Sequence, residues 1–133
     1  MAFLFPNGEK RVSQASMLQD LFRTIDARDS RKFVSFLTPD ATFRFGNAPA
    51  IAGHAAIEQA VGGFFASLKA LSHQLIATWE QGDSLALQGE VTYTRHDGSQ
   101  ITLPFANVFR LRDGLLREYL IYADVAPLYA PPA

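Results

Sequence analysis

The 133-residue chain contains no cysteine. This absence excludes a disulfide framework, a thiolate zinc site, an iron–sulfur cluster and a cysteine nucleophile. The chain also has no excess of charge of one sign, because 12 basic and 13 acidic side chains give a formal net charge of -1. A nucleic-acid binder usually carries a basic excess or a basic stripe, so we expect no nucleic-acid partner.

Long hydrophobic runs are missing as well. No apolar stretch approaches the roughly 18 residues that a membrane-spanning helix needs. The apolar start, Met1 to Pro6, is short and lacks a basic flank, so it does not read as a signal peptide. We therefore expect a cytoplasmic protein that has no membrane partner.

Histidine is scarce and scattered. His54, His73 and His96 form neither an HxH nor an HExxH spacing, which are patterns that hold metal ions. No glycine-rich phosphate loop and no G-x-S-x-G string is present either. We expect no metal site and no cofactor.

What the chain does contain is apolar surface and aromatic rings. Hydrophobic residues make up 48% of the sequence and charged residues 19%, a balance typical of a folded domain and not of a disordered chain. Eleven phenylalanines predict an aromatic core or an aromatic-lined pocket. The length predicts one domain over residues 1–133, with a short N-terminal arm at 1–11 and a C-terminal arm at 125–133.

Helical spacing of apolar residues predicts three helices. Leu18, Leu21, Phe22 and Ile25 form one apolar stripe in a first helix over residues 13–27. A short second helix opens at Asp29–Ser30 and is expected to end before Pro39, and a third covers residues 54–69. The pair Gly62–Gly63 inside the third helix lowers helix stability, which suggests a close approach by another part of the chain.

The second half of the chain alternates apolar and polar residues, as strands do. Predicted strands cover residues 41–45, 71–80, 84–95, 100–111 and 115–124, with turns at Gly82–Asp83, Asp97–Gly98 and Asp113–Gly114. This order predicts an α+β fold in which a cone-shaped, curved antiparallel sheet carries three helices packed on its concave side. The helices cover only part of such a sheet, so the cone is expected to be open at its mouth.

Several strings in this order resemble the SnoaL-like branch of the nuclear-transport-factor-two-like superfamily. They are Phe36-Leu-Thr-Pro-Asp-Ala-Thr42, Gly53-His-Ala-Ala-Ile57, Asn107-Val-Phe-Arg-Leu111 with Asp113-Gly114, and Tyr122-Ala-Asp124. The resemblance covers nearly the whole domain and implies the cone fold. It leaves the activity open, because this fold carries isomerases, cyclases, epoxide hydrolases, dehydratases and non-catalytic binders.

The resemblance also shows which familiar catalytic residues are absent. Matched to the ketosteroid isomerases, the tyrosine position is Leu21, the base position is Phe45 and the protonated acid position is Asn107. Familiar ketosteroid isomerase activity is therefore not expected. Matched to the limonene epoxide hydrolases, the relay positions are Glu90, Gln88 and Ile121, and the water-holding positions are Phe43 and Phe45.

We therefore predict Glu90 as a general acid or base and Asn107 as a donor to a substrate oxygen. A structural Glu90–Arg117 ion pair and a catalytic His73 are the alternatives. Strand alternation in the matched register directs Leu103, Asn107 and Phe109 on one strand, and Leu115 and Arg117 on the last, into the cone. The predicted ligand-binding residues are Leu21, Phe43, Phe45, Phe65, Gln88, Phe105, Arg117, Tyr119 and Ile121.

Three functions remain open from the sequence. The first is a pocket protein that binds a small apolar ligand, polyketide- or steroid-like, with isomerase- or cyclase-type proton transfer. The second is a non-catalytic binding or accessory homodimer, and the third is a structural homodimer whose cone is packed shut. The homodimer is expected through the sheet, because Leu85, Leu87, Val91 and Tyr93 are assigned to its convex face.

Overall fold

The computed structural model describes the backbone of residues 8–130 and the side chains of residues 14–130. Residues 1–7 of the predicted N-terminal arm and 131–133 of the C-terminal arm lie outside these ranges. In chain order the elements are α1 (Gly8–Asp26), α2 (Ser30–Phe33), η1 (Val34–Phe36), β1 (Leu37–Phe45), β2 (Ile51–Ala52), α3 (His54–Ala66), β3 (Ala70–Gln81), β4 (Ser84–Thr94), β5 (Gln100–Arg112), β6 (Leu115–Tyr122) and α4 (Ala126–Tyr129).

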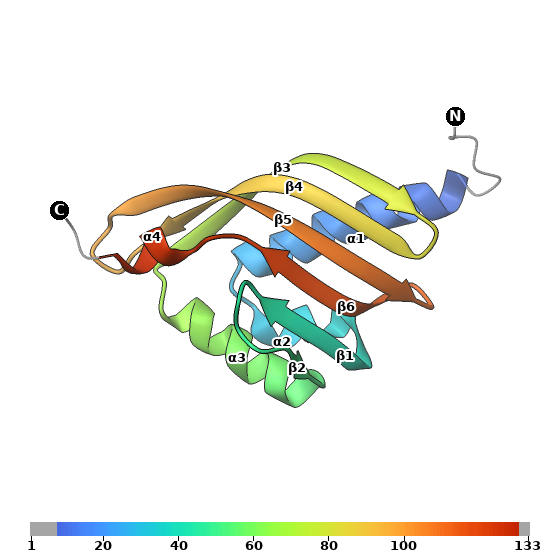
Figure 1. Ribbon diagram of the computed structural model, residues 1–133, viewed down its shortest axis with the longest axis horizontal. Helices are drawn as coiled ribbons and strands as arrows, with labels where there is room; N and C mark the ends of the chain where they lie inside the picture. The colour runs from blue at the N-terminus through green and yellow to red at the C-terminus, as the bar shows by residue number, and fades with distance from the viewer. Residues whose placement is uncertain (1–7, 131–133) are drawn as a thin grey trace.

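The six strands form one curved sheet in the order β2-β1-β6-β5-β4-β3 (Figure 1). Neighbouring strands are antiparallel except for β1 and β6, which run parallel. The predicted α+β fold with a curved, cone-like sheet is confirmed. The two-residue strand β2 lies between the predicted strand at 41–45 and the predicted helix at 54–69, and α4 adds a fourth short helix.

The helices enclose the concave side of the sheet. Helix α1 runs beneath β3, β4 and β5, while α2 and α3 lie beside β1 on the other side of the bend (Figure 1). The predicted stripe of α1 is buried, with Leu18, Leu21, Phe22 and Ile25 all at most 6% exposed. Burying such a stripe is what holds an amphipathic helix on a sheet.

Gly62 of α3 marks the close approach that the sequence suggested. A Cβ atom at Gly62 would lie 3.1 Å from the Ser30 side-chain oxygen of α2, whereas one at Gly63 would meet nothing within 4 Å. The missing side chain at Gly62 therefore lets α2 pack against α3. Gly63 has no such contact.

Several element boundaries differ from the prediction. Helix α1 begins at Gly8, so residues 8–11 continue the helix and do not form an arm. Pro39 lies inside β1, because α2 and η1 already end at Phe36. The C-terminal arm includes α4, whose Leu128 is only 5% exposed because it is packed onto the domain.

The hairpin turns are confirmed. Gly82 and Gly98 adopt positive φ angles, as do Asp113 and Gly114 together at 55° and 82°. Two successive residues with positive φ match a type I′ turn, whose twist suits a two-residue hairpin. Within residues 8–130, no helix is both long and apolar enough to cross a membrane.

A bulge on β6 decides which of its side chains enter the cone. The register with β5 shifts between the pairs Arg110–Glu118 and Leu111–Leu116, so Arg117 is the extra residue. As a result Leu116 is fully buried while Leu115 is 36% exposed. The expected inward direction of Leu115 and Arg117 is wrong, because a bulge interrupts strict alternation.

Candidate functional site

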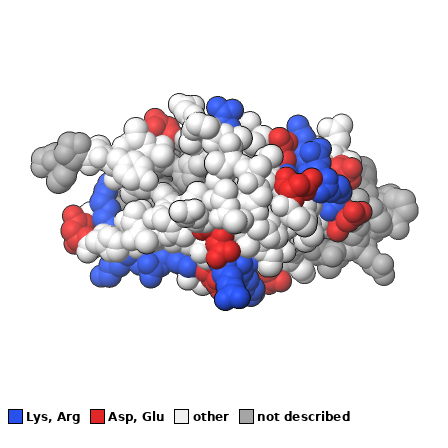
Figure 2. All heavy atoms as spheres, turned by 90° about the horizontal axis from the view of Figure 1, so that it is seen from below, with Lys and Arg blue, Asp and Glu red and all other residues white. Residues whose placement is uncertain are grey.

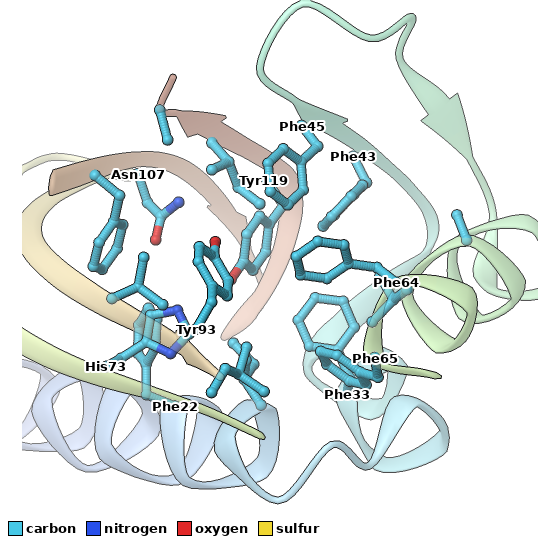
Figure 3. Close-up of a pocket in the computed structure, with 18 residues that line it drawn as sticks. Phe22, Phe33, Phe43, Phe45, Phe64, Phe65, His73, Tyr93, Asn107 and Tyr119 are labelled. Atoms are coloured by element: carbon cyan, nitrogen blue, oxygen red, sulfur yellow. The ribbon is translucent and has the colours of Figure 1, made fainter. Parts of the chain in front are cut away.

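A cavity of about 150 Å³ lies inside the cone, between the sheet and the helices (Figure 3). Its walls are mainly aromatic, and rings from α1, α2, α3, β1 and β5 meet there. The aromatic-lined pocket expected from the phenylalanine content is present. Seven of the predicted site residues line it: Phe43, Phe45, Phe65, Phe105, Asn107, Tyr119 and Ile121.

Glu90 does not reach this pocket. Its side chain is exposed, whereas Leu85, Leu87, Val91 and Tyr93 of the same strand are at most 4% exposed. Asn107 pairs across the sheet with Leu87, and Glu90 pairs with Pro104, so Asn107 and Glu90 point to opposite faces. The predicted meeting of Glu90 and Asn107 in the cone is wrong.

The alternation of β4 explains this error. Apolar side chains occupy one face of the strand and the polar Gln88, Glu90 and Thr92 occupy the other. An unpaired carboxylate is far better solvated by water than by an apolar cone, so the apolar set turns inward. The resemblance to a relay position does not determine on which face of β4 Glu90 lies, whereas the alternation does.

Three further predicted ligand contacts are not made in the pocket. Leu21 is fully buried in the core, and Gln88 is exposed on the outer face. Arg117 borders a separate hollow formed with the Asp113–Gly114 turn. Within residues 14–130 no ion pair joins Glu90 to Arg117.

Asn107 is 2% exposed, and its amide has a fixed orientation. Its Nδ2 donates to the Leu120 carbonyl oxygen at 3.3 Å. A carbonyl can only accept, so the NH₂ group must face it and Oδ1 must face away. Among side chains 14–130, Asn107 Oδ1 is the buried polar atom that has no hydrogen-bond partner. The amide NH₂ carries two N–H groups, so a second N–H remains beside the unpaired acceptor Oδ1.

His73 forms the one hydrogen-bonded acid–base pair at the pocket wall among residues 14–130. Its Nδ1 lies 2.6 Å from Asp26 Oδ1, and its backbone N–H donates to Asp26 Oδ2 at 3.0 Å. The carboxylate can only accept, so Nδ1 carries the hydrogen and a neutral imidazole presents Nε2 as an acceptor. Phe22 and Phe105 pack on the ring at centroid distances of 5.0 and 5.2 Å.

Sequence reasoning named His73 only as an alternative base and did not identify Asp26. The two residues are 47 positions apart, at the end of α1 and near the start of β3. Alternation along β3 signals that His73 shares a face with Leu71 and Leu75. No local pattern signals the partner carboxylate.

Two tyrosines supply the pocket's hydroxyl groups. Tyr93 and Tyr119 line the cavity together with Asn107, and Figure 3 shows their hydroxyl oxygens turned into the pocket. Burial raises the pKa of Tyr93 to about 12 and raises that of Tyr119 further. Both phenols therefore stay protonated at neutral pH and can donate hydrogen bonds.

A scan of protein families matches the SnoaL-like domain to residues 18–119, which is more than half of the chain. A comparison with curated proteins finds no match. Solved structures show the fold. A protein from Jannaschia sp. CCS1, provisionally named a SnoaL-like polyketide cyclase, has 18% identity and a TM-score of 0.78, with 91% of this chain and 94% of that chain covered.

Two other solved structures agree. An NTF2-like protein of unknown function from Exiguobacterium sp. 255-15 has 24% identity and a TM-score of 0.69, covering 81% of this chain and 98% of that one. TerC, co-crystallized with polyporic acid, has 20% identity and a TM-score of 0.75, covering 88% and 95%. The family match shows that the chain belongs to the SnoaL-like domain family.

Proposed function

We propose that the protein binds a small apolar ligand in the aromatic pocket and performs isomerase- or cyclase-type proton transfer on it, with His73 as the base. The observation that carries this proposal is the His73–Asp26 hydrogen bond of 2.6 Å at the wall of the cavity. Histidine is the side chain most often used for proton transfer near neutral pH.

The other pocket groups suit the same chemistry. His73 Nε2 would take a proton from a carbon next to a ligand carbonyl, and the electron pair of that C–H bond would move onto the carbonyl oxygen as an enolate. The hydroxyl groups of Tyr93 and Tyr119 would donate to that oxygen. Where the ligand has a carbon–carbon double bond conjugated with the enolate, return of the proton from His73 to the far carbon of that system shifts the double bond and completes an isomerization.

Proteins of similar fold support a small-molecule ligand. TerC was co-crystallized with polyporic acid, and the Jannaschia protein is provisionally named as a polyketide cyclase. For this chain we propose a polyketide- or steroid-like ligand of which one ring enters the cavity. A cavity of about 150 Å³ is the size that takes a benzene ring.

The test uses 2-indanone, a small ketone with acidic C–H bonds, in deuterated buffer. Proton NMR follows the exchange of its α-hydrogens. We expect the protein to accelerate exchange, and His73→Gln to lower the enzymatic rate by roughly 10²-fold or more. Asp26→Asn should also lower the rate, because one of the two oxygens that accept from His73 becomes an NH₂ group, which cannot accept the backbone N–H or the Nδ1 hydrogen.

His96→Gln is the matched control, because His96 lies on the β4–β5 hairpin and bonds the Ala66 carbonyl outside the pocket. It should leave the exchange rate unchanged. Melting temperatures separate a structural role from a catalytic one. A His73→Gln variant that melts normally and keeps the full exchange rate would remove His73 from the mechanism.

The non-catalytic alternative rests on a different observation. Phe45 lines the pocket where the isomerases have their base, and Leu21 is fully buried where they have their tyrosine. If the wild-type protein binds 2-indanone without accelerating exchange, the ligand-binding function stands and the catalytic one fails.

A further inference from the structure

A second hollow adjoins the inner cavity. A groove of about 680 Å³ lies at the mouth of the cone and shares Phe45, Phe64 and Ala123 with the cavity. The Phe45 and Phe64 rings are tilted against each other at a centroid distance of 5.2 Å, at the border between the two spaces. A molecule that fills the inner cavity and extends past these two rings enters the groove.

The far wall of this groove is the C-terminal segment, residues 123–129. Tyr129 faces the groove and is 63% exposed, whereas the preceding residue, Leu128, is 5% exposed. The segment is thus anchored by Leu128 and presents an aromatic ring beside an opening.

Arg95 holds that wall in place. Its Nε donates to the Leu128 carbonyl at 3.1 Å, and its Nη2 donates to the Pro127 carbonyl at 3.2 Å. Asp124 Oδ1 accepts the N–H of Ala126, the first residue of the short helix α4, at 3.0 Å. Two hydrogen bonds from one guanidinium fix the direction of the segment as well as its distance.

The lining also indicates the charge of the ligand. Of the described residues around the cavity and the groove, Asp124 is the only one with a side chain that is charged at neutral pH apart from the ionizable His73. The centre of the face that α3 occupies is also uncharged, with acidic and basic side chains toward its edges (Figure 2). No basic side chain lines the cavity or the groove to attract an anionic ligand.

We infer that the ligand is an elongated, non-anionic aromatic molecule, with one ring in the inner cavity and a second in the groove against Tyr129. Arg95 acts as a positioning residue, because it touches the segment and not the ligand. This inference rests on the proposed binding function. It adds a site at the C-terminal segment that selects ligands by length.

The test compares two probes by ¹⁹F NMR titration of the intact protein. 4-Fluorophenol fills the inner cavity alone, and 4-fluoro-4′-hydroxybiphenyl is long enough to reach the groove. Tyr129→Ala should weaken binding of the biphenyl roughly fivefold or more and change binding of 4-fluorophenol less than twofold. Arg95→Gln should also weaken binding of the biphenyl more than binding of 4-fluorophenol, because the C-terminal segment loses its two hydrogen bonds to the Arg95 guanidinium.

Tyr122→Ala is the matched control, because Tyr122 is 58% exposed on β6 and does not line the groove. It should leave both affinities unchanged. Nuclear Overhauser contacts from the biphenyl to the Tyr129 ring locate the bound probe directly. If both probes bind and Tyr129→Ala weakens neither, or weakens both equally, the extended site is overturned while the inner pocket stands. If neither probe binds, the proposed binding function fails with it.

Discussion

At the scale of single residues, the buried polar groups distinguish this pocket from an ordinary apolar core. Asn107 donates one N–H to the Leu120 carbonyl oxygen, and its Oδ1 has no hydrogen-bond partner. An unpaired buried acceptor lowers stability by about 1–3 kcal/mol.

Replacing Asn107 tests this argument. We expect Asn107→Leu to leave the free energy of unfolding unchanged or to raise it by about 1 kcal/mol, because the orphaned acceptor is removed. Asn107→Asp should lower it by about 3 kcal/mol or more, because a buried carboxylate would face the Leu120 carbonyl. Urea unfolding measures both. A large loss of stability in Asn107→Leu would show that the amide is a structural requirement.

At the scale of elements, the contact between α2 and α3 depends on one missing side chain. A Cβ atom at Gly62 would lie 3.1 Å from the Ser30 oxygen, and one at Gly63 would lie in open space. Both glycines are inside α3, so both lower its intrinsic helix stability by a similar amount.

The two glycines therefore give a matched pair. Gly63→Ala should raise the free energy of unfolding by about 0.5–1 kcal/mol, because alanine restricts the unfolded chain and fits the helix. Gly62→Ala should raise the free energy of unfolding by at least about 0.5 kcal/mol less than Gly63→Ala does, because the Ser30 side chain must move to make room for the new Cβ atom. Thermal and urea unfolding of the two variants provide the comparison. Equal gains would show that α2 yields without strain.

At the scale of the whole molecule, the outer face of the sheet carries a row of apolar side chains. The residues predicted for this face, Leu85, Leu87, Val91 and Tyr93, are instead buried inside the cone. They therefore cannot form a dimer contact on the outer face. The row is formed by the register-matched residues Trp79, Ala86, Val108 and Leu120, with Tyr122 nearby. Trp79 and Tyr122 are 57% and 58% exposed.

We propose that a second copy covers this row. We expect sedimentation equilibrium to show a dimer at micromolar concentration, and Trp79→Glu to give a folded monomer. Gln59→Glu, at an exposed position of α3, should remain dimeric. A wild-type monomer under these conditions would contradict the proposal.

Local patterns in the sequence were enough to predict much of this protein. The apolar stripe of α1, the three hairpin turns and the inward set of β5 all follow from spacing that neighbouring residues impose on the backbone. Phe105, Asn107 and Phe109 are buried as alternation predicts. Membership of the cone fold followed from the order of these elements and from the strings that resemble the family.

The tertiary structure decided the chemistry of the site. Only the folded sheet shows that Arg117 is the extra residue of a bulge, because the register between two strands depends on their pairing. Asp26 meets His73 from 47 residues away, and Arg95 holds a segment more than 30 residues downstream. Contacts between distant segments leave no periodic trace in the chain, because they form only when the sheet bends and brings those segments together.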